Sequence, residues 1–454
     1  MLRELHQDWV KALVAAGPAT VQAELDQKAR ELSLCYGERP VCRVLRPYFL
    51  RRAVYEDLER RCRRLVPAIH AALARARADG ELWSRLKFSD AEMTLIEAGR
   101  VGGASDLLGR LDAFLGDDGV PRFMEFNGES PGGLAFGDML GLVFEQTAPF
   151  RKLGSKWDLS RVAVVPKAVE ALRASWMAWR IRRGQGTSLA PRVAIVDLPG
   201  MPTRGEFEIF QAAFERAGMP ARVIDDVDLK IEGRTLMAGD FAPDLVYRRL
   251  VTMDILEKRG GKHLLAEVAE RNLAWVANGF EGFALCHKGL FALLSDPSLR
   301  PPDLDAEQER IIDESIPWTR LVEPGRKTSP PGGGPARDLA EIAREQREDL
   351  VMKPATGYGG QGILLGWRTD AEAWEAALGA PRTDCWVVQQ RIPLSTSSWP
   401  VLVDGRLEEV ELHFDVCPYR IGGRAEGLGI RLSGGEILNV AAGLGSAVPA
   451  FIVE

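Results

Sequence analysis

Over the first hundred residues, apolar positions recur at spacings of three and four. The stretches TVQAELDQKARELSL, RAVYEDLERRCRRLVPAIHAALARARADGELWSRL and SDAEMTLIEAGR all carry this spacing, which is that of amphipathic helices. The pattern predicts a helical N-terminal region over residues 1–105.

On either side of LGDDGVP the pattern changes to an alternation of apolar and polar residues. A period of two is typical of half-buried strands. The apolar positions are Leu111, Ala113, Met124 and Phe126, and the polar positions are Arg110, Asp112, Glu125 and Asn127. For residues 106–190 we therefore predict two paired strands, followed by a helix over SRVAVVPKAVEALRASWMAWRIRRG.

Residues 191–300 alternate between short apolar runs and amphipathic stretches. The runs PRVAIVDLPG, ARVIDDVD, PDLVYRRL and LAWVANGF are predicted strands, and EFEIFQAAFERAGM and KHLLAEVAERN are predicted helices. This alternation predicts a Rossmann-like parallel sheet with crossover helices. Because the first strand lacks a glycine fingerprint, no dinucleotide site is predicted there.

Residues 301–454 begin with helical and apolar stretches and then contain a segment dense in proline and glycine, 323–338. We interpret that segment as a mobile loop or domain joint without regular structure. After it come EDLVMKPATGYGGQGILLGW, a helical TDAEAWEAALGA, an apolar CWVVQQRI and strands separated by glycines. The fold class predicted for the whole chain is mixed α/β, or α+β.

The hairpin of residues 106–190 has a predictable register. An Asp-Gly pair at 118–119 suits a two-residue type I′ turn. Cross-strand partners then have numbers that sum to 237, so Asp112 faces Glu125 and Arg110 faces Asn127.

Two carboxylates side by side repel each other unless a cation lies between them. Asp112, Glu125 and the amide oxygen of Asn127 are hard ligands suited to Mg²⁺, and Arg110 is placed to meet a transferred phosphoryl group. The alternative is a polar, solvent-facing hairpin with incidental charges.

The segment KPATGYGGQGILLGW contains GxGxxG at Gly357, Gly359 and Gly362, but it is followed by a predicted strand rather than the helix of a dinucleotide fold. A strand, a glycine turn and a returning strand make a flap whose backbone N–H groups can close over phosphates. Lys353 precedes the glycines, and neither the later kinase motifs nor a Walker A lysine is present. A protein kinase and a P-loop protein are therefore disfavoured, and Lys353 is predicted to meet phosphate.

Other candidate positions keep two interpretations each. Lys288 begins an apolar helix and is either a phosphate ligand or an exposed first-turn charge. The end of the strand WVVQQRI, which holds Gln389, Gln390 and Ile392, either binds adenine or packs in the core. Arg431 is either an anion ligand or a surface residue, whereas His413 and Asp415 are interpreted as structural.

Composition and charge exclude several classes of protein. Hydrophobic residues make up 46% and charged residues 27% of the 454-residue chain, which is typical of globular proteins of two or three domains. The net charge of −6 argues against nucleic acid or anionic lipid as a partner, and the arginine clusters LRPYFLRRAVYEDLERRCRRL and AWRIRRG are interpreted as solvated helix faces. No membrane span or signal peptide is predicted, six scattered cysteines suggest reduced thiols, and a cytoplasmic location is expected.

Together the motifs RLD, EFNGESPGG, HKGLFALLSD, IPWTR, VMKPATGYGGQGILLGW, VVQQRI and RLSGGEILNVAAGLGSAVP resemble circularly permuted ATP-grasp proteins, the group that includes the synthetase half of glutathionylspermidine synthetase. In ordinary ATP-grasp ligases the lysines and the flap precede the metal ligands, whereas here the carboxylate hairpin comes first.

The resemblance implies a role for each matching residue. It implies Mg²⁺ ligation by Asp112, Glu125 and Asn127, and contacts of Arg110, and less surely of Arg431, with the acyl-phosphate centre. The implied ATP ligands are Lys288 and Lys353 for the phosphates, the flap residues Gly357, Tyr358, Gly359, Gly360, Gln361 and Gly362, and Gln389, Gln390 and Ile392 for adenine.

The activity that the resemblance implies is an ATP- and Mg²⁺-dependent carboxylate-amine ligase, with a small-molecule or peptide acid and an amine as substrates. Amidase activity is not expected, because the helical N-terminal region shows no cysteine-protease pattern. An ATP-binding scaffold without turnover and a small-molecule kinase or ATPase are the alternatives.

Overall fold

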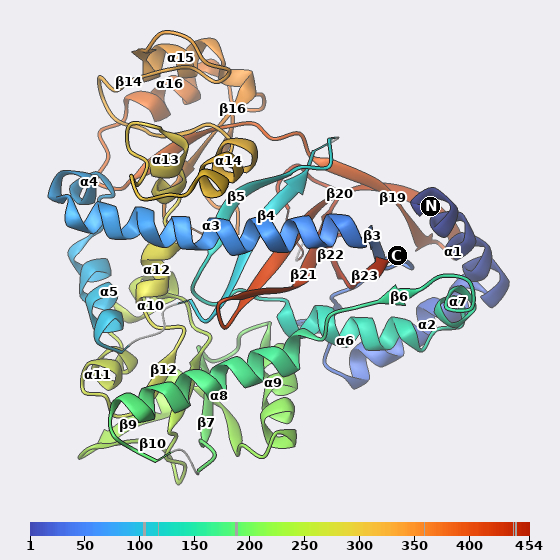
Figure 1. The fold of residues 1–454 in the computed structure, drawn as a ribbon. Helices are drawn as coiled ribbons and strands as arrows, with labels where there is room; N and C mark the ends of the chain where they lie inside the picture. The colour runs from blue at the N-terminus through green and yellow to red at the C-terminus, as the bar shows by residue number, and fades with distance from the viewer. Residues whose placement is uncertain (103–105, 117, 187–188, 358, 439, 441–442) are drawn as a thin grey trace.

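The computed structural model describes the chain except for residues 103–105, 117, 187–188, 358, 439 and 441–442, and it has a mixed α/β architecture. In Figure 1 a central antiparallel sheet lies between a parallel sheet below it and a smaller antiparallel sheet above it. These three sheets determine where the polar residues of the predicted site can meet.

The central sheet joins the predicted hairpin to strands from the end of the chain. Its strand order is β22-β21-β20-β4-β5, and β19 pairs with another part of β20. The strands are β4 (Leu108–Leu115), β5 (Pro121–Asn127), β19 (Ser395–Val403), β20 (Arg406–Ile421), β21 (Arg424–Ser433) and β22 (Ser446–Val448). Strands about 300 residues apart in sequence are therefore hydrogen-bonded neighbours, as in the pair Val416 and Ala113.

One face of the hairpin packs on a long helix, α3 (Arg52–Ala78), which crosses the sheet in Figure 1. Leu111, Ala113, Phe123 and Phe126 share one hydrophobic cluster with the apolar residues of α3. Because side chains alternate across a strand, Arg110 and Asp112 lie on the opposite face of the sheet.

The parallel sheet confirms the pattern predicted for residues 191–300. Its order is β12-β11-β7-β8, and all three pairings are parallel. Its strands are β7 (Val193–Asp197), β8 (Ala221–Asp225), β11 (Leu245–Arg248) and β12 (Trp275–Ala277). The accompanying helices are α8 (Val164–Arg182), α9 (Arg204–Arg216), α10 (Thr252–Arg259) and α11 (Leu264–Glu270), and β9 (Leu229–Glu232) and β10 (Thr235–Ala238) form a hairpin beside them.

The third sheet has the order β13-β18-β16-β17 and is antiparallel. Its strands are β13 (Thr319–Leu321), β16 (Leu350–Pro354), β17 (Leu364–Leu365) and β18 (Trp386–Gln390). The helices around it are α12 (Glu281–Leu285), α13 (Gly289–Ser295), α14 (Ala306–Ser315), α15 (Leu339–Glu345) and α16 (Ala371–Gly379). The prediction that 323–338 lacks regular structure is wrong at its end and near its start, because β14 (Lys327–Thr328) pairs with β15 (Arg337–Asp338).

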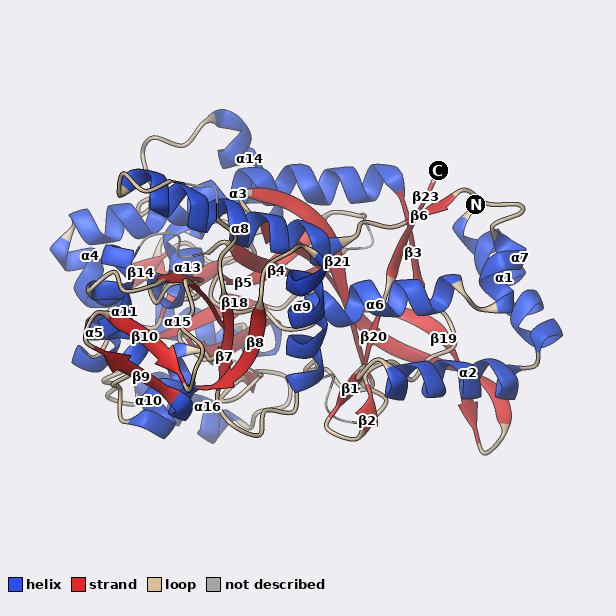
Figure 2. Cartoon of the chain, turned by 90° about the horizontal axis from the view of Figure 1, so that it is seen from below, coloured by secondary structure: helices blue, strands red, loops and turns tan. Residues whose placement is uncertain are grey.

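The N-terminal region is less uniformly helical than predicted. Besides α1 (Leu2–Ala16), α2 (Pro18–Glu31), α4 (Gly80–Arg85) and α5 (Asp90–Gly102), it contains β1 (Cys35–Tyr36), β2 (Arg39–Pro40) and β3 (Tyr48–Arg51). Strand β3 pairs with β23 (Ala450–Val453), which also pairs with β6 (Leu159–Ser160), and thereby ties together both ends of the described chain. In Figure 2 α2 and α6 (Leu134–Glu145) cover the outer part of the central sheet, and the short α7 (Ala148–Leu153) packs on α1.

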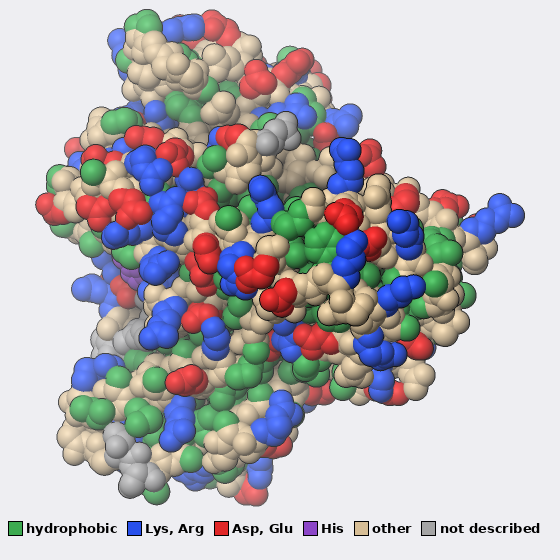
Figure 3. All heavy atoms as spheres, turned by 45° about the vertical axis from the view of Figure 1, so that its right-hand side comes forward, with side chains coloured by type: hydrophobic (Ala, Val, Ile, Leu, Met, Phe, Trp, Pro, Cys, Tyr) green, Lys and Arg blue, Asp and Glu red, His purple; other side chains and the backbone are tan. Residues whose placement is uncertain are grey.

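The first arginine cluster is only in part a solvated helix face, because Arg63 and Arg64 are exposed whereas Arg61 is buried. On α3, Arg61 contacts Glu314 of α14 at 2.9 Å and Arg64 contacts Glu307 at 2.6 Å, so the cluster joins two helices. Basic and acidic side chains are interspersed on the face drawn in Figure 3. None of the described helices combines the length and the apolarity needed to cross a bilayer.

Close backbone packing at Gly366, directly after β17, gives a stability prediction. A Cβ at this position would overlap the carbonyl of Arg347 and lie 2.7 Å from the Leu350 oxygen. We expect Gly366→Ala to lower the free energy of unfolding by about 2 kcal/mol or more, because backbone atoms cannot yield as side chains do. Urea denaturation measures the change, and Gly379→Ala is the control, since nothing lies within 4 Å of a Cβ there. Equal stability of the two variants would contradict the prediction.

Candidate active site

The hairpin pairs its polar residues as predicted. Arg110 lies opposite Asn127, and Asp112 lies opposite Glu125. The turn, however, is not the predicted two-residue type. The last cross-strand pair is Leu115 with Pro121, so the five residues 116–120 lie between the two strands.

A bulge in β5 compensates for the different loop. Ala113 pairs with Phe123, so Met124 is the additional residue between two regular pairs. As a result Phe123 and Phe126 are both buried, while Met124 and Glu125 both line a cavity. The prediction that Met124 belongs to the apolar face is wrong, because the bulge reverses the alternation at that point.

Asp112 is held by two arginines from two strands. It is fully buried, and Arg110 donates to it through Nε at 2.6 Å and through Nη2 at 3.0 Å. Arg431 of β21 adds a bond from Nη2 at 2.7 Å. Burial acts to raise the pKa of Asp112, but the two guanidinium groups outweigh it and hold the pKa well below its ordinary value.

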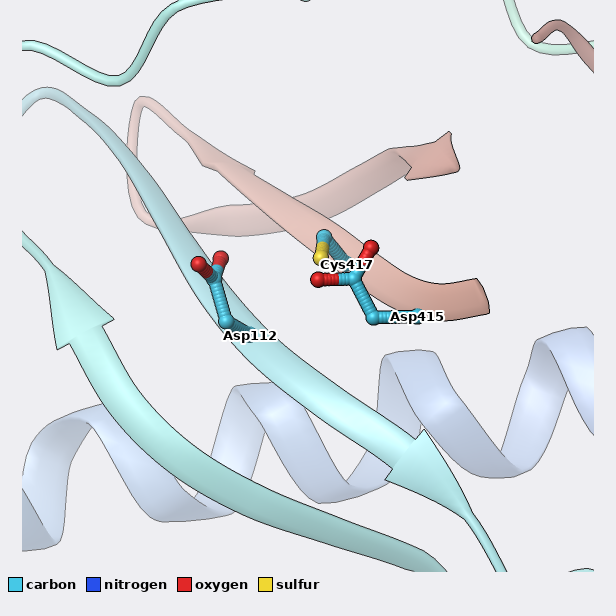
Figure 4. Close-up of side chains that lie close together, drawn as sticks. All are labelled: Asp112, Asp415 and Cys417. Carbon is cyan, nitrogen blue, oxygen red and sulfur yellow. The ribbon is translucent and has the colours of Figure 1, made fainter. Parts of the chain in front are cut away.

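Two residues of β20 complete this cluster, and we had interpreted one of them, Asp415, as merely structural. Figure 4 shows Asp112, Asp415 and Cys417 on neighbouring strands, with side chains on the same side of the sheet. Their potential ligand atoms lie within 4.8 Å of one another. Burial raises the pKa of both Asp415 and the Cys417 thiol, although Arg431 contacts Asp415 directly.

A cavity opens beside this cluster, between the central sheet and the third sheet. It encloses about 1060 Å³, counting the space at its open mouth. Two buried lysines lie on its wall, Lys288 at the start of α13 and Lys353 on β16. Lys288 Nζ lies 3.2 Å from Glu125 Oε2, which links the start of α13 to the central sheet electrostatically. Burial acts to raise the pKa of Glu125, but Lys288 and Lys353 together hold it below its ordinary value.

Lys353 is oriented by the side chain of Gln389, a residue of the strand end that is predicted either to bind adenine or to pack in the core. Its Nζ donates to Gln389 Oε1 at 2.8 Å, and Gln389 Nε2 in turn donates to Thr319 Oγ1 at 2.9 Å. Burial lowers the pKa of Lys353 to about 8, and the nearby Glu125 limits the fall. The buried Gln389 side chain therefore positions a lysine, while Gln390 and Ile392 line the cavity.

The glycine-rich segment joins two antiparallel strands, as predicted for a flap, because Val351 of β16 pairs with Leu365 of β17. Gly359, Gly360 and Gly362 have φ values of 67°, 80° and 71°, which residues with a side chain rarely adopt. Lys288 Nζ donates to the Gly357 carbonyl at 2.8 Å, so the flap is held towards the cavity. Tyr358 lies outside the described residues.

A second loop, after β21, closes the cavity from the other side. Glu436, Ile437 and Leu438 line it, and Glu436 accepts bonds from Trp367 Nε1 at 3.0 Å and from Arg368 Nε at 2.8 Å. These three residues lie in the motif RLSGGEILNVAAGLGSAVP, but no role is predicted for any of them. The glycines before this loop were the available signal, but they did not indicate which segment it faces.

Most of the predicted positions meet in one place. Of the predicted positions, those that line the cavity are Glu125, Lys288, Lys353, Gly357, Gly359, Gly360, Gln361, Gln389, Gln390, Ile392 and Arg431. Arg110, Asp112, Asn127 and Gly362 are not part of its lining. Arg431 connects the two groups, because it contacts Asp112 and also lines the cavity.

The fold of this chain is similar to that of a solved glutathione synthetase-like effector from Globodera pallida in its apo form. The match covers 97% of this chain and 98% of that one, with a TM-score of 0.60 at 12% sequence identity. A candidate gamma-glutamylcysteine synthetase from Methylobacillus flagellatus matches 83% of this chain and 84% of its own at a TM-score of 0.40 and 12% identity, which is too low to support an argument. No family model and no curated protein sequence matches the chain.

The charge state of Lys353 gives a prediction about pH. Its pKa falls from the ordinary 10.5 to about 8 on folding, so the unfolded chain holds more protons between these pH values. The free energy of unfolding contributed by this group therefore rises with pH in that window. We expect Lys353→Met to be about 3 kcal/mol more stable than the wild type at pH 7, and to lose this advantage as pH approaches 10.5.

Urea denaturation of both proteins across this pH range measures the difference. Lys327→Met, at an exposed lysine of β14, is the control and should differ from the wild type by a constant amount. If the difference in free energy of unfolding between the wild type and Lys353→Met does not change with pH, Lys353 keeps an ordinary pKa.

Proposed function

We propose that this protein is an ATP- and Mg²⁺-dependent carboxylate-amine ligase with a circularly permuted ATP-grasp fold. It would form an amide or peptide bond through an acyl phosphate and release ADP and phosphate. The observation that carries the proposal is the single cavity in which two buried lysines, a carboxylate, an arginine and a glycine flap face the same space.

The lining of the cavity suits a nucleotide. Apolar side chains from β16, β17 and the segment after β18 line the part next to Gln390, and Val351, Ile363, Leu365 and Leu394 are among them. This part suits the adenine ring, while Lys288 and Lys353 provide the cations for the phosphates. The flap would then close over the phosphates and exclude water that hydrolyses an acyl phosphate.

Charge supports a bound anion together with a metal ion. The cluster and the cavity wall together hold four basic side chains, those of Arg110, Arg431, Lys288 and Lys353, and four carboxylates, those of Asp112, Glu125, Asp415 and Glu436. These side chains therefore have no net charge, whereas ATP brings about four negative charges. A divalent cation offsets part of that excess, so the residues fit Mg²⁺.

The predicted metal ligands differ in how available they are. Neither Glu125 Oε1 nor Asn127 Oδ1 accepts a hydrogen bond from any described residue, so both oxygens are available to a cation. Asp112 accepts three bonds from arginines. We therefore propose Glu125 and Asn127 as ligands of Mg²⁺, joined by Asp112 through Oδ2, which would exchange its bond from Arg431 for the metal while keeping its bond from Arg110. When bound, Mg²⁺ would offset phosphate charge during phosphoryl transfer.

The protein's own side chains would position the ATP phosphates and stabilise the charge on the group being transferred, and no protein nucleophile is required. Lys288 and Lys353 would hold the phosphates, and Arg431 would face the group that is transferred from ATP to the acid. The sequence order supports permutation, because the hairpin precedes the flap in the chain yet pairs with β20, which follows it.

The test is ADP release by purified protein with Mg-ATP, against pools of amino acids, short peptides and polyamines. We expect release that needs one acid and one amine, that EDTA abolishes, and that Glu125→Gln lowers by about 100-fold. Glu341→Gln, at an exposed acid of α15, is the control and should keep full activity. Release without an amine would indicate a kinase or ATPase, and Mg²⁺-dependent ATP binding without release would indicate a scaffold.

A further inference from the structure

Asp415 has no part in the reaction described so far, yet it holds a side chain that lines the cavity. It is fully buried on β20 and lies directly opposite Arg431 of β21. Its carboxylate accepts bonds from the Arg431 backbone N–H at 3.2 Å and from Nε at 3.0 Å, and it also contacts Nη2.

These contacts determine which nitrogen of Arg431 is available. Nε and Nη2 are committed to Asp415, and Nη2 also donates to Asp112 at 2.7 Å. Nη1 makes no hydrogen bond to any described residue, and the Arg431 side chain, 24% exposed, lines the cavity. Because the guanidinium group is planar, fixing two of its nitrogens fixes the direction of the third.

We propose that Asp415 is a positioning residue that directs Arg431 Nη1 at the outermost phosphate of ATP. The inference rests on the proposed ATP site. Asp112 cannot do this alone, because it meets a single nitrogen of Arg431, about which the guanidinium could turn, and it is shared with Arg110. A donor misplaced by about 1 Å can cost about 100-fold in rate.

A double-mutant cycle on nucleotide binding tests this without requiring turnover. Calorimetry with Mg²⁺ gives Kd for ATP and for ADP, and the preference for ATP is their ratio. We expect Asp415→Asn to reduce the preference about tenfold with little change in Kd for ADP, and Arg431→Ala to do the same. In the Arg431→Ala background, Asp415→Asn should then have no further effect, because it acts through Arg431. Additive effects of the two substitutions would overturn the proposal.

Asp106→Asn is the matched control. Asp106 is also buried, and it accepts a bond at 2.5 Å from Arg420, which lies on β20 as Asp415 does. Neither Asp106 nor Arg420 lines the cavity. We expect this variant to keep the ATP preference of the wild type even where it lowers stability. An equal loss in Asp106→Asn would mean that any damage to the sheet has this effect, and would overturn the role of Asp415.

If Asp415→Asn does not fold, Arg431→Lys carries the test. A lysine keeps a cation between Asp112 and Asp415 but has no group that corresponds to Nη1. The preference for ATP over ADP should therefore fall as in Arg431→Ala. A retained preference would overturn the proposal. A wild type that binds ATP no better than ADP would also overturn the proposal. A wild type that prefers ATP but shows no ligase turnover would contradict the proposed function alone, and the double-mutant cycle would still test the role of Asp415.

Discussion

Charge compensation inside the central sheet is the constraint on which the site depends. A fully buried carboxylate such as Asp112 is strongly destabilising unless its partners are in place. Those partners come from its own strand, through Arg110, and from β21, through Arg431. Strand β20 lies between them and contributes Asp415. A shift of any of these strands by one residue would turn a charged side chain into the apolar layer beneath α3. The register of the sheet and the charges of the site are thus mutually dependent.

The cavity exists because three separate parts of the fold meet at its wall. The central sheet supplies Glu125 and Arg431, the third sheet supplies Lys353, and the start of α13 supplies Lys288. Each sheet stabilises a charge that belongs to the other, since Lys353 lowers the pKa of Glu125 and Glu125 limits the fall in the pKa of Lys353. The relative placement of the two sheets is therefore under electrostatic as well as apolar control. Binding of an anion in the cavity would change this balance for both sheets at once.

Local pattern was sufficient for much of the fold. The parallel sheet follows from buried runs alternating with amphipathic helices, and the flap follows from glycines between two strands. The pairing of Asp112 with Glu125 was also predicted, but through a turn that the structure does not contain. A loop that shifts the register by one and a bulge at Met124 that shifts it back give the same pairs. Because the effects of the longer loop and of the bulge on the register cancel, neither can be recognised from the alternation of apolar and polar residues.

The remaining features depend on contacts between distant segments. The Asp415–Arg431 pair could not be derived from the turn at Gly422 and Gly423, because an irregularity near Pro418 moves the register by one residue. The pairing of β3 with β23 joins two short apolar runs, and nothing in either run indicates that the other is its partner. The role of Gln389 as the partner of Lys353 likewise requires knowing that β16 and β18 are neighbours. Such information lies in strand order, which periodicity does not encode.

The pairing of β4 with β20 also orders events during synthesis. The parallel sheet is built from one continuous stretch of chain, so it can form as soon as its last strand, β12, has left the ribosome. The hairpin of β4 and β5 emerges much earlier, but its neighbour β20 ends only at Ile421. Until then the hairpin presents an unpaired edge, and Asp112 has Arg110 but not Arg431 as a partner. The nascent chain carries this segment without its neighbour for nearly 300 residues, during which it is exposed to chaperones and to misassembly.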